Sequence, residues 1–123
     1  MDLRFTAEEL AFRDEVRSFI RQALPEKVKI KLIEGRQITK EEYVSWQRTL
    51  NAKGWAVPHW PVEWGGTGWN AVQHYFFDDE LQQAPAPLAL PLNVNMVGPV
   101  IAAFGTNEQK KRFLPRIANL DDW

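Results

Sequence analysis

Apolar residues recur at helical spacing over several stretches of the chain, and most of these stretches open with a helix-start signal. Thr6 and Glu9 form the sequence pattern of a capping box, with Phe5 and Leu10 placed as its hydrophobic staple. The apolar face that follows consists of Leu10, Phe12, Val16, Phe19 and Ile20. Because proline disfavours helical geometry in the residue before it, Pro25 should end this first helix.

Three later residue pairs repeat the capping pattern and predict three more helices. These pairs are Thr39 with Glu42, Asn70 with Gln73, and Thr106 with Gln109. Gly54 stands where a C-terminal glycine cap would stand, and Pro85 should stop the helix that follows Asn70. Pro115 should end or disturb the last helix, because proline removes a main-chain donor and crowds the preceding turn.

Three stretches do not follow this pattern. Residues 26–37 begin with alternating polar and apolar positions, but no other stretch offers a strand partner, so a short exposed helix or irregular segment ending at Gly35 is the better interpretation. Residues 55–69 are rich in Trp, Pro and Gly and predict a long loop that is functional or tightly packed. Residues 88–104 are nearly all apolar or small, and they predict a buried helix kinked or broken around Gly98.

Together these elements predict an all-α fold of about five to six helices. The long Trp/Pro/Gly loop should lie between the second and third major helices. A chain of 123 residues is the size of one domain and can bury a real core.

Composition and charge narrow the classes of function. Fifteen Lys and Arg residues against sixteen Asp and Glu residues give a net charge of −1, which offers no electrostatic basis for nucleic-acid binding. No apolar run reaches the ~18 residues of a membrane span, and the acidic N-terminus lacks the features of a signal peptide. Cysteine is absent, which excludes disulfides and thiolate metal sites. We therefore expect a cytoplasmic protein with no nucleic-acid and no membrane partner.

Individual polar groups do not assemble into a catalytic set. His59 and His74 lie far apart without acidic neighbours at ligand spacing, so we expect no metal site. Residues 65–68 lack the lysine and the preceding strand of a phosphate-binding loop, so a structural turn is the better interpretation. Three acidic clusters fit solvated helix faces or caps better than acid–base catalysis; they are Glu41–Glu42, Asp78–Glu80 and Asp121–Asp122. Residues 88–104 could line an apolar tunnel or belong to the core, and the residues alone leave both open.

The order of several short motifs is similar to that of the N-terminal helical domain of the acyl-CoA dehydrogenases. In chain order these motifs are Gly54-Trp55, Pro58, Pro61-Val62-Glu63-Trp64-Gly65-Gly66-Thr67-Gly68, Asp79-Glu80-Leu81, Ala84-Pro85, Gly98-Pro99-Val100-Ile101, Phe104-Gly105-Thr106 and Gln109-Lys110-Lys111-Arg112-Phe113-Leu114-Pro115-Arg116-Ile117. The resemblance runs from Phe5 to about Trp123. Around residues 59–61 and 120–123 the sequence is also similar to large-subunit types, including those assigned to pimeloyl-CoA.

The resemblance implies an N-terminal domain or fragment of a flavin-dependent oxidoreductase that dehydrogenates the Cα–Cβ bond of an acyl-CoA. In the family a glutamate removes the α-proton, FAD accepts the hydride, and an electron-transferring flavoprotein accepts the electrons. The expected partners are the acyl-CoA substrate, that flavoprotein, and the remaining domains and other subunits of the same enzyme. Residues 1–123 should be the N-terminal helical domain alone, without the middle β-domain and the C-terminal helical domain.

Several consequences follow from that resemblance for this chain. The catalytic glutamate and the flavin contacts belong to the absent domains, so neither Glu63 nor Glu80 inherits the role of the base. The chain alone should therefore hold no FAD, carry no catalytic residue and be inactive. Apolar surface left exposed for the other domains should promote self-association.

What this region should supply is one wall of the acyl pocket. By residue order the candidate substrate-binding residues are Leu88, Pro91, Leu92, Asn95, Met96 and Pro99. Asn95 is polar among apolar neighbours, and because a buried amide needs a hydrogen-bond partner, we expect it to meet a polar group of the acyl chain. A different class of function stays open, namely a stand-alone, non-catalytic helical module that binds acyl groups or a partner subunit.

Overall fold

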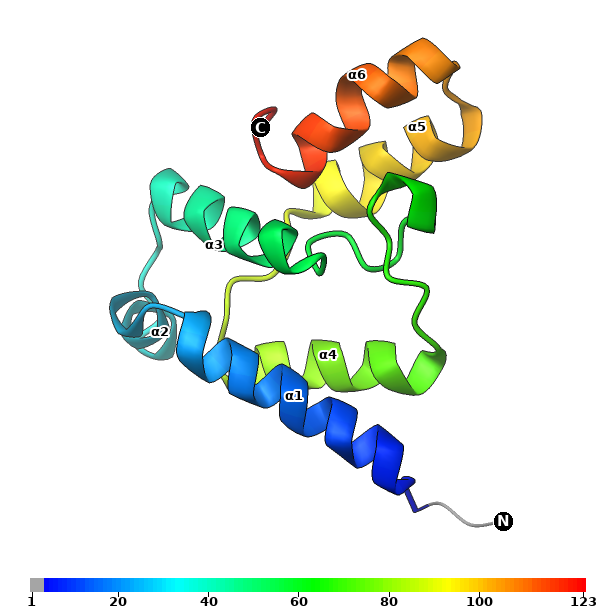
Figure 1. The fold of residues 1–123 in the computed structure, drawn as a ribbon. Helices are drawn as coiled ribbons and strands as arrows, with labels where there is room; N and C mark the ends of the chain where they lie inside the picture. Colours follow the sequence, from blue (N-terminus) through cyan, green and yellow to red (C-terminus); the bar gives the residue numbers. More distant parts are fainter. Residues whose placement is uncertain (1–3) are drawn as a thin grey trace. The chain divides into compact units, whose positions relative to one another are not determined.

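The computed structural model describes residues 4–123. It contains six α-helices and, among the described residues, no β-strand (Figure 1). The predicted all-α fold of about five to six helices is therefore confirmed. Within residues 4–123, no helix combines the length and the apolar character that a membrane crossing requires. The described residues form two compact units, each built from two separate stretches of the chain.

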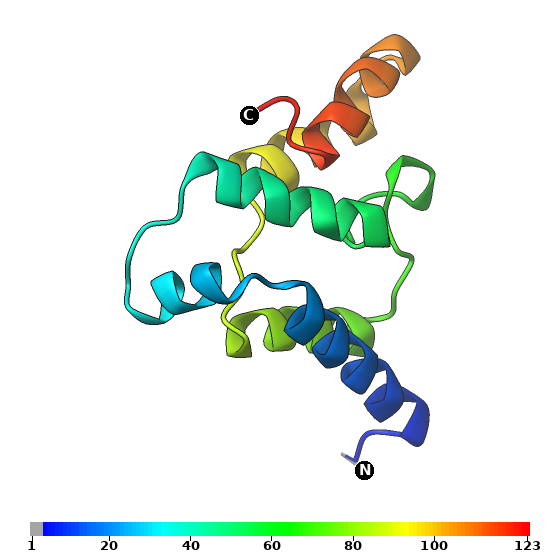
Figure 2. The same cartoon turned by 60° about the vertical axis from the view of Figure 1, so that its left-hand side comes forward.

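The first unit comprises residues 4–38 and 69–88. Its helices are α1 (Ala7–Ala23), α2 (Glu26–Ile33) and α4 (Ala71–Gln83). Helices α1 and α4 pack side by side, as both views show (Figures 1 and 2). The buried apolar residues of this unit are Val16, Ile20, Leu24, Val28, Phe76, Phe77, Leu81 and Ala86. Aromatic contacts extend the α1–α4 contact, with ring centroids 5.2 Å apart for Phe12 and Trp69 and 4.7 Å apart for Phe5 and Phe76.

The second unit comprises residues 39–68 and 89–123. Its elements are α3 (Lys40–Lys53), the short 3₁₀ helix η1 (Val62–Trp64), the π-helix η2 (Pro91–Val97), α5 (Gly98–Phe104) and α6 (Asn107–Ala118). Helix η2 leads directly into α5, and α6 packs against α5 (Figure 2). Its core includes Trp46, Leu50, Trp55, Val57, Trp60, Val94, Leu114, Ile117 and Leu120.

The helix starts follow the sequence signals closely. All four predicted capping boxes are present, at Thr6, Thr39, Asn70 and Thr106. In each box the cap side chain accepts a hydrogen bond from the amide three residues on, and that residue's side chain accepts one in return. Gly54 caps α3 in the left-handed conformation with φ of 84°.

The expectations for residues 26–37 and for Pro115 are only partly confirmed. Residues 26–33 form helix α2 rather than a strand, as preferred, but Val28 is only 2% exposed and anchors this helix in the core. Pro115 does not end α6, which runs on to Ala118. Burial of Leu114 and Ile117 on the same helix stabilises the last turn despite the missing donor.

The predicted loop between α3 and α4 is tightly packed. Trp55, Val57 and Trp60 are all buried, so this loop contributes to the core of the second unit. Gly65 follows η1 with φ of 106°, a conformation that favours glycine. Gly66 lies so close to the Trp60 carbonyl that a Cβ would collide with it. The glycines therefore form a structural turn, as expected.

Candidate functional site

The residues predicted to line an acyl pocket do not all lie in the same unit. Pro91, Leu92, Asn95 and Met96 lie on η2, and Pro99 lies in the first turn of α5, so these five share one continuous helical segment. Leu88 belongs to the first unit and lies outside that segment. The predicted break around Gly98 is the junction at which the π-helix becomes an α-helix.

The expectation that residues 88–104 are buried is wrong. Only Val94 and Gly98 of the η2–α5 segment are buried; its apolar residues Leu92, Met96, Val97, Val100 and Phe104 are all exposed, Leu92 by 67% and Phe104 by 87%. The segment packs through one side, and no described residue of its unit covers these five side chains. Asn95 is exposed too, so the argument that a buried amide demands a partner does not apply to it in this chain.

Trp60 contacts the packed side of this segment. Its indole Nε1 donates a hydrogen bond of 2.7 Å to the main-chain oxygen of Val94. Its ring fills the space beside Gly98, where any Cβ would collide with the indole. Gly98 N–H donates to Asn93 O, five residues earlier, which is the π-type bond that ends η2.

A groove of about 830 Å³ runs beside the same segment. Its lining comes from η2, α5, α6 and the residues after α6: Leu92, Asn93, Val97, Ile101, Arg112, Phe113, Arg116, Ile117, Asp122 and Trp123. Of the predicted residues, only Leu92 lines it. Apolar side chains form most of the lining, which also includes the Arg116–Asp122 ion pair at 2.7 Å. Hydrogen bonds from Arg116 lower the pKa of Asp122.

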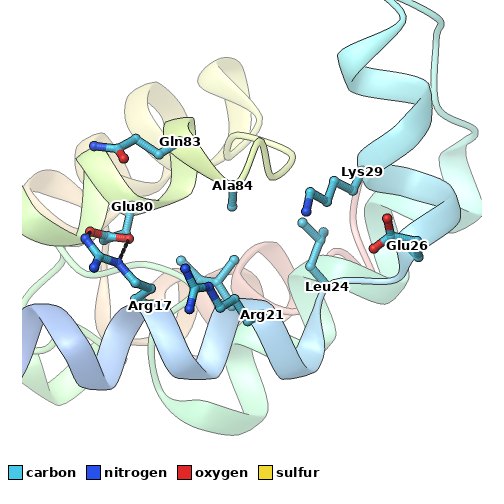
Figure 3. Close-up of a pocket in the computed structure, with 9 residues that line it drawn as sticks. Arg17, Arg21, Leu24, Glu26, Lys29, Glu80, Gln83 and Ala84 are labelled. Atoms are coloured by element: carbon cyan, nitrogen blue, oxygen red, sulfur yellow. Dashed lines mark hydrogen bonds and ion pairs between the residues drawn. The ribbon is translucent and has the colours of Figure 1, made fainter.

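The first unit holds a second hollow, of about 450 Å³, with an ionic lining (Figure 3). Arg17 on α1 and Glu80 on α4 lie at one end of it and form a bidentate ion pair at 3.0 and 2.8 Å, and this pairing raises the pKa of Arg17. Arg21 and Lys29 reach toward the hollow from α1 and α2 (Figure 3). Such a lining suits a small polar group and not an acyl chain, so the η2–α5 segment remains the better acyl-binding candidate.

The position of Glu80 corrects the interpretation of the acidic cluster Asp78–Glu80. Glu80 was expected on a solvated face, but it is only 4% exposed. Its burial is possible because α4 packs against α1 and brings Arg17 within hydrogen-bond distance. Among the described residues, Glu80 therefore connects α4 to α1 through its ion pair with Arg17.

Other groups singled out in the sequence are not brought together. Glu63 is exposed on η1, and His59 and His74 lie in different units. Within residues 4–123, no three His, Asp or Glu side chains are placed to hold a metal ion.

Sequence reasoning missed the α6 side of the groove and the role of Trp60. Phe113 and Ile117 are spaced four residues apart on a helix that is otherwise strongly charged, which was a readable sign of an apolar stripe. Trp60 and Val94 are 34 positions apart, and no local pattern connects them.

Comparison with known proteins places these features in context. The family described as "Acyl-CoA dehydrogenase, N-terminal domain" matches residues 6–121. The protein named acyl-CoA dehydrogenase FadE26 of Mycobacterium tuberculosis is 35% identical over 120 residues, which are 96% of this chain and 30% of that protein. The chain therefore spans less than one third of the length of this relative.

Two solved structures resemble the fold. One is the ChsE4–ChsE5 complex from Mycobacterium tuberculosis, with a TM-score of 0.78 and 34% identity over 98% of this chain and 30% of that one. The other is described as the Tcur3481–Tcur3483 steroid ACAD, also with a TM-score of 0.78 and 34% identity, over 98% of this chain and 31% of that one.

Proposed function

This chain belongs to the acyl-CoA dehydrogenase family, whose N-terminal domain it matches, and we propose that it serves as the N-terminal helical domain of a flavin-dependent acyl-CoA dehydrogenase. In this proposal the domain supplies one wall of the acyl pocket. The middle β-domain and the C-terminal helical domain lie outside these 123 residues. The narrower resemblance to the pimeloyl-CoA type stays a prediction.

The exposed apolar face of η2 and α5 carries the proposal. Leu92 and Met96 are 67% and 57% exposed, although both are large and apolar. Several large apolar side chains exposed on one short helical segment are typical of a site for another molecule or domain. With Pro91, Asn95, Pro99 and Leu88, they are the residues that we propose contact the acyl group.

We assign FAD to the rest of the enzyme. The resemblance implies flavin contacts from a strand segment of the middle β-domain, and that is the part of the enzyme that we expect to hold the cofactor. The resemblance likewise places the catalytic base in another domain, and Glu80 is in addition occupied by its ion pair with Arg17. No chemical step is therefore derived for this chain.

The substrate and partners belong to the same proposal. One similar structure is described as a steroid ACAD, which makes a steroid-bearing CoA ester the first substrate to test. Both similar structures pair two named components, which supports a second, different subunit beside this one. An electron-transferring flavoprotein would accept the electrons.

The test replaces wall residues in the full-length enzyme. We expect Leu92→Ala and Met96→Ala to lower kcat/KM for a steroid-bearing CoA ester by about tenfold, with a smaller effect on a short straight-chain ester, because a short chain leaves part of the wall unused. Val62→Ala is the matched control, since Val62 is 68% exposed but lies on η1.

Two outcomes would count against the proposal. One is an equal ratio of the two kcat/KM values in all three variants and the wild type. The other is dehydrogenation by the purified 123-residue chain, which would show that it needs neither the flavin site nor the base of other domains. If the full-length gene product proved to lack those domains, the stand-alone acyl-binding or subunit-binding module would take its place.

A further inference from the structure

The main-chain oxygen of Val94 lacks the two donors that a helix would ordinarily offer it, four and five residues on. Gly98 N–H, four residues on, bonds instead to the oxygen of Asn93. The donor five residues on would be residue 99, which is a proline and carries no N–H. Because Val94 is only 4% exposed, its carbonyl needs a partner from another part of the chain.

Trp60 supplies this partner. Its Nε1 donates to the Val94 oxygen at 2.7 Å, and the whole residue is buried. The approach is possible because residue 98 is glycine, since a Cβ at that position would collide with the indole ring. The Trp60 indole therefore replaces the donor that Pro99 lacks. The absence of a side chain at Gly98 gives the indole the space to do so.

The indole is itself held firmly by the loop that carries it. Trp60 N–H donates to Val57 O at 3.0 Å, and Gly66 closes against the Trp60 carbonyl. Thr67 donates to Pro58 O through its amide at 3.3 Å and its hydroxyl at 3.2 Å. The loop thus provides a fixed support against which η2 is placed.

We propose that Trp60 is a positioning residue that holds residues 91–97 in the π conformation and so determines which acyl groups the wall accepts. The inference rests on the proposed function, because it takes this segment as the wall. A change from π-type to α-type bonding would turn the residues beyond the change by about 100° around the axis, the angle per residue of an α-helix. Leu92 and Met96 would then face different directions relative to Pro99.

The first test compares two tryptophan variants in the full-length enzyme. Trp60→Phe keeps an aromatic ring but removes the donor, whereas Trp55→Phe removes another buried indole of the same loop. We expect Trp60→Phe alone to change the ratio of kcat/KM for steroid-bearing and short straight-chain CoA esters by about tenfold. Amide hydrogen exchange at Gly98 should also become faster by about fivefold, the factor expected for one lost hydrogen bond.

The second test is a rescue. Pro99→Ala restores a main-chain N–H at the position that can donate to Val94 O, so the double variant Trp60→Phe/Pro99→Ala should recover both the ratio and the slow exchange of Gly98. The single variant Pro99→Ala completes the double-mutant cycle, because it measures how much the loss of Pro99 by itself changes the ratio. A loss of general packing would not be repaired by a backbone donor, so the rescue separates positioning from stability.

Three results would overturn the proposal: equal behaviour of Trp60→Phe and Trp55→Phe, a folded double variant without rescue, or an unchanged ratio and exchange in Gly98→Ala. The last variant displaces the ring while keeping its N–H, and it replaces Trp60→Phe if that protein does not fold. If the proposed function fails instead, Leu92→Ala and Met96→Ala leave the ratio unchanged while Gly98 exchange still responds to Trp60→Phe. In that case Trp60 would still position η2, but its role in substrate selectivity would be refuted because η2 would not be a wall of the acyl pocket.

Discussion

Arg17 and Glu80 show how one pair of side chains can connect distant parts of a sequence. They are 63 positions apart, yet they form two hydrogen bonds between α1 and α4. Glu80 is buried and Arg17 is partly exposed, so the carboxylate is the member that depends on its partner. Removing a partner from a buried charge is more harmful than removing an exposed pair.

Arg17→Gln should therefore destabilise the domain more than Arg13→Gln does. Arg13 lies on the same helix and pairs with Asp14, whose side chain is 61% exposed, so it serves as the matched control. Thermal unfolding followed by circular dichroism would measure both. Equal melting temperatures for the two variants would mean that the Glu80 carboxylate finds water or another partner.

Asp122 should make stability depend on acid pH through its pairing with Arg116. Hydrogen bonds from Arg116 lower the pKa of Asp122 below its ordinary value of 3.8. A carboxyl whose pKa is lowered by folding adds stability above its ordinary pKa, and this is lost as pH falls through the folded-state value. The free energy of unfolding of Arg116→Gln should thus lie below that of the wild type at neutral pH, and the difference should shrink as the pH falls below 3.8 and through the folded-state pKa of Asp122.

Urea denaturation across this range would measure the effect. Arg21→Gln is the control, because it removes a cation that forms no ion pair with the described residues, and its curve should run parallel to that of the wild type. Parallel curves for Arg116→Gln as well would contradict the role assigned to the pair.

Residue-scale features were predictable where their causes are local. The capping boxes at Thr6, Thr39, Asn70 and Thr106 connect residues three positions apart, so the sequence pattern contains both partners. The burial of Glu80 depends on a residue in another helix, and no local pattern contains that information. The same holds for Gln47, whose buried amide donates to Ala118 O, 71 positions away.

At the scale of elements, helices were predicted more reliably than their burial. The segment 88–104 is nearly all apolar or small, so its composition favours the core, yet six of its large apolar side chains are exposed. Composition records what could be buried, whereas the packing partner decides what is buried. The π conformation of η2 was likewise beyond prediction, because it depends on Trp60 as well as on Pro99.

Pro115 should lower the stability of helix α6, and this can be tested. Pro115 lies inside this helix and is exposed, so its ring contributes little packing while it removes a main-chain hydrogen bond. Pro115→Ala should raise the free energy of unfolding by about 2 kcal/mol, after allowance for the greater freedom of the unfolded chain. Pro91→Ala is the control: Pro91 begins η2, where proline is favourable, and no gain is expected there.

Urea titration of both proline variants would provide the numbers. A loss of stability in Pro115→Ala would mean that Pro115 shapes the turn after α6, in which Asn119 N–H bonds to Pro115 O at 3.2 Å.

At the scale of the whole molecule, the chain spans about 30% of the length of FadE26 and of the matched chain in the ChsE4–ChsE5 complex. It exposes several large apolar side chains on η2 and α5, which together we call the η2–α5 face. The isolated chain should self-associate through this face, because nothing among the described residues of that unit covers it. Phe104, 87% exposed, is the largest exposed side chain on it. Phe104→Ser should weaken self-association by about tenfold or more, given the apolar area that a phenylalanine buries.

Sedimentation equilibrium over a range of concentrations would measure the change. Val62→Ser is the control, since Val62 is 68% exposed outside the η2–α5 face and its loss should not matter. A wild-type chain that stays monomeric at high concentration would contradict the expectation, and so would equal weakening by the two substitutions.

The close fit of Trp60 against Gly98 also predicts how these two positions change during evolution. A mutation that adds a side chain at position 98 has no room while the indole is present, and a smaller residue at position 60 leaves the Val94 carbonyl without its donor. A substitution at either position alone should therefore destabilise the protein. Among homologous sequences, alanine or serine at 98 should therefore coincide with loss of tryptophan at 60 and with a residue other than proline at 99.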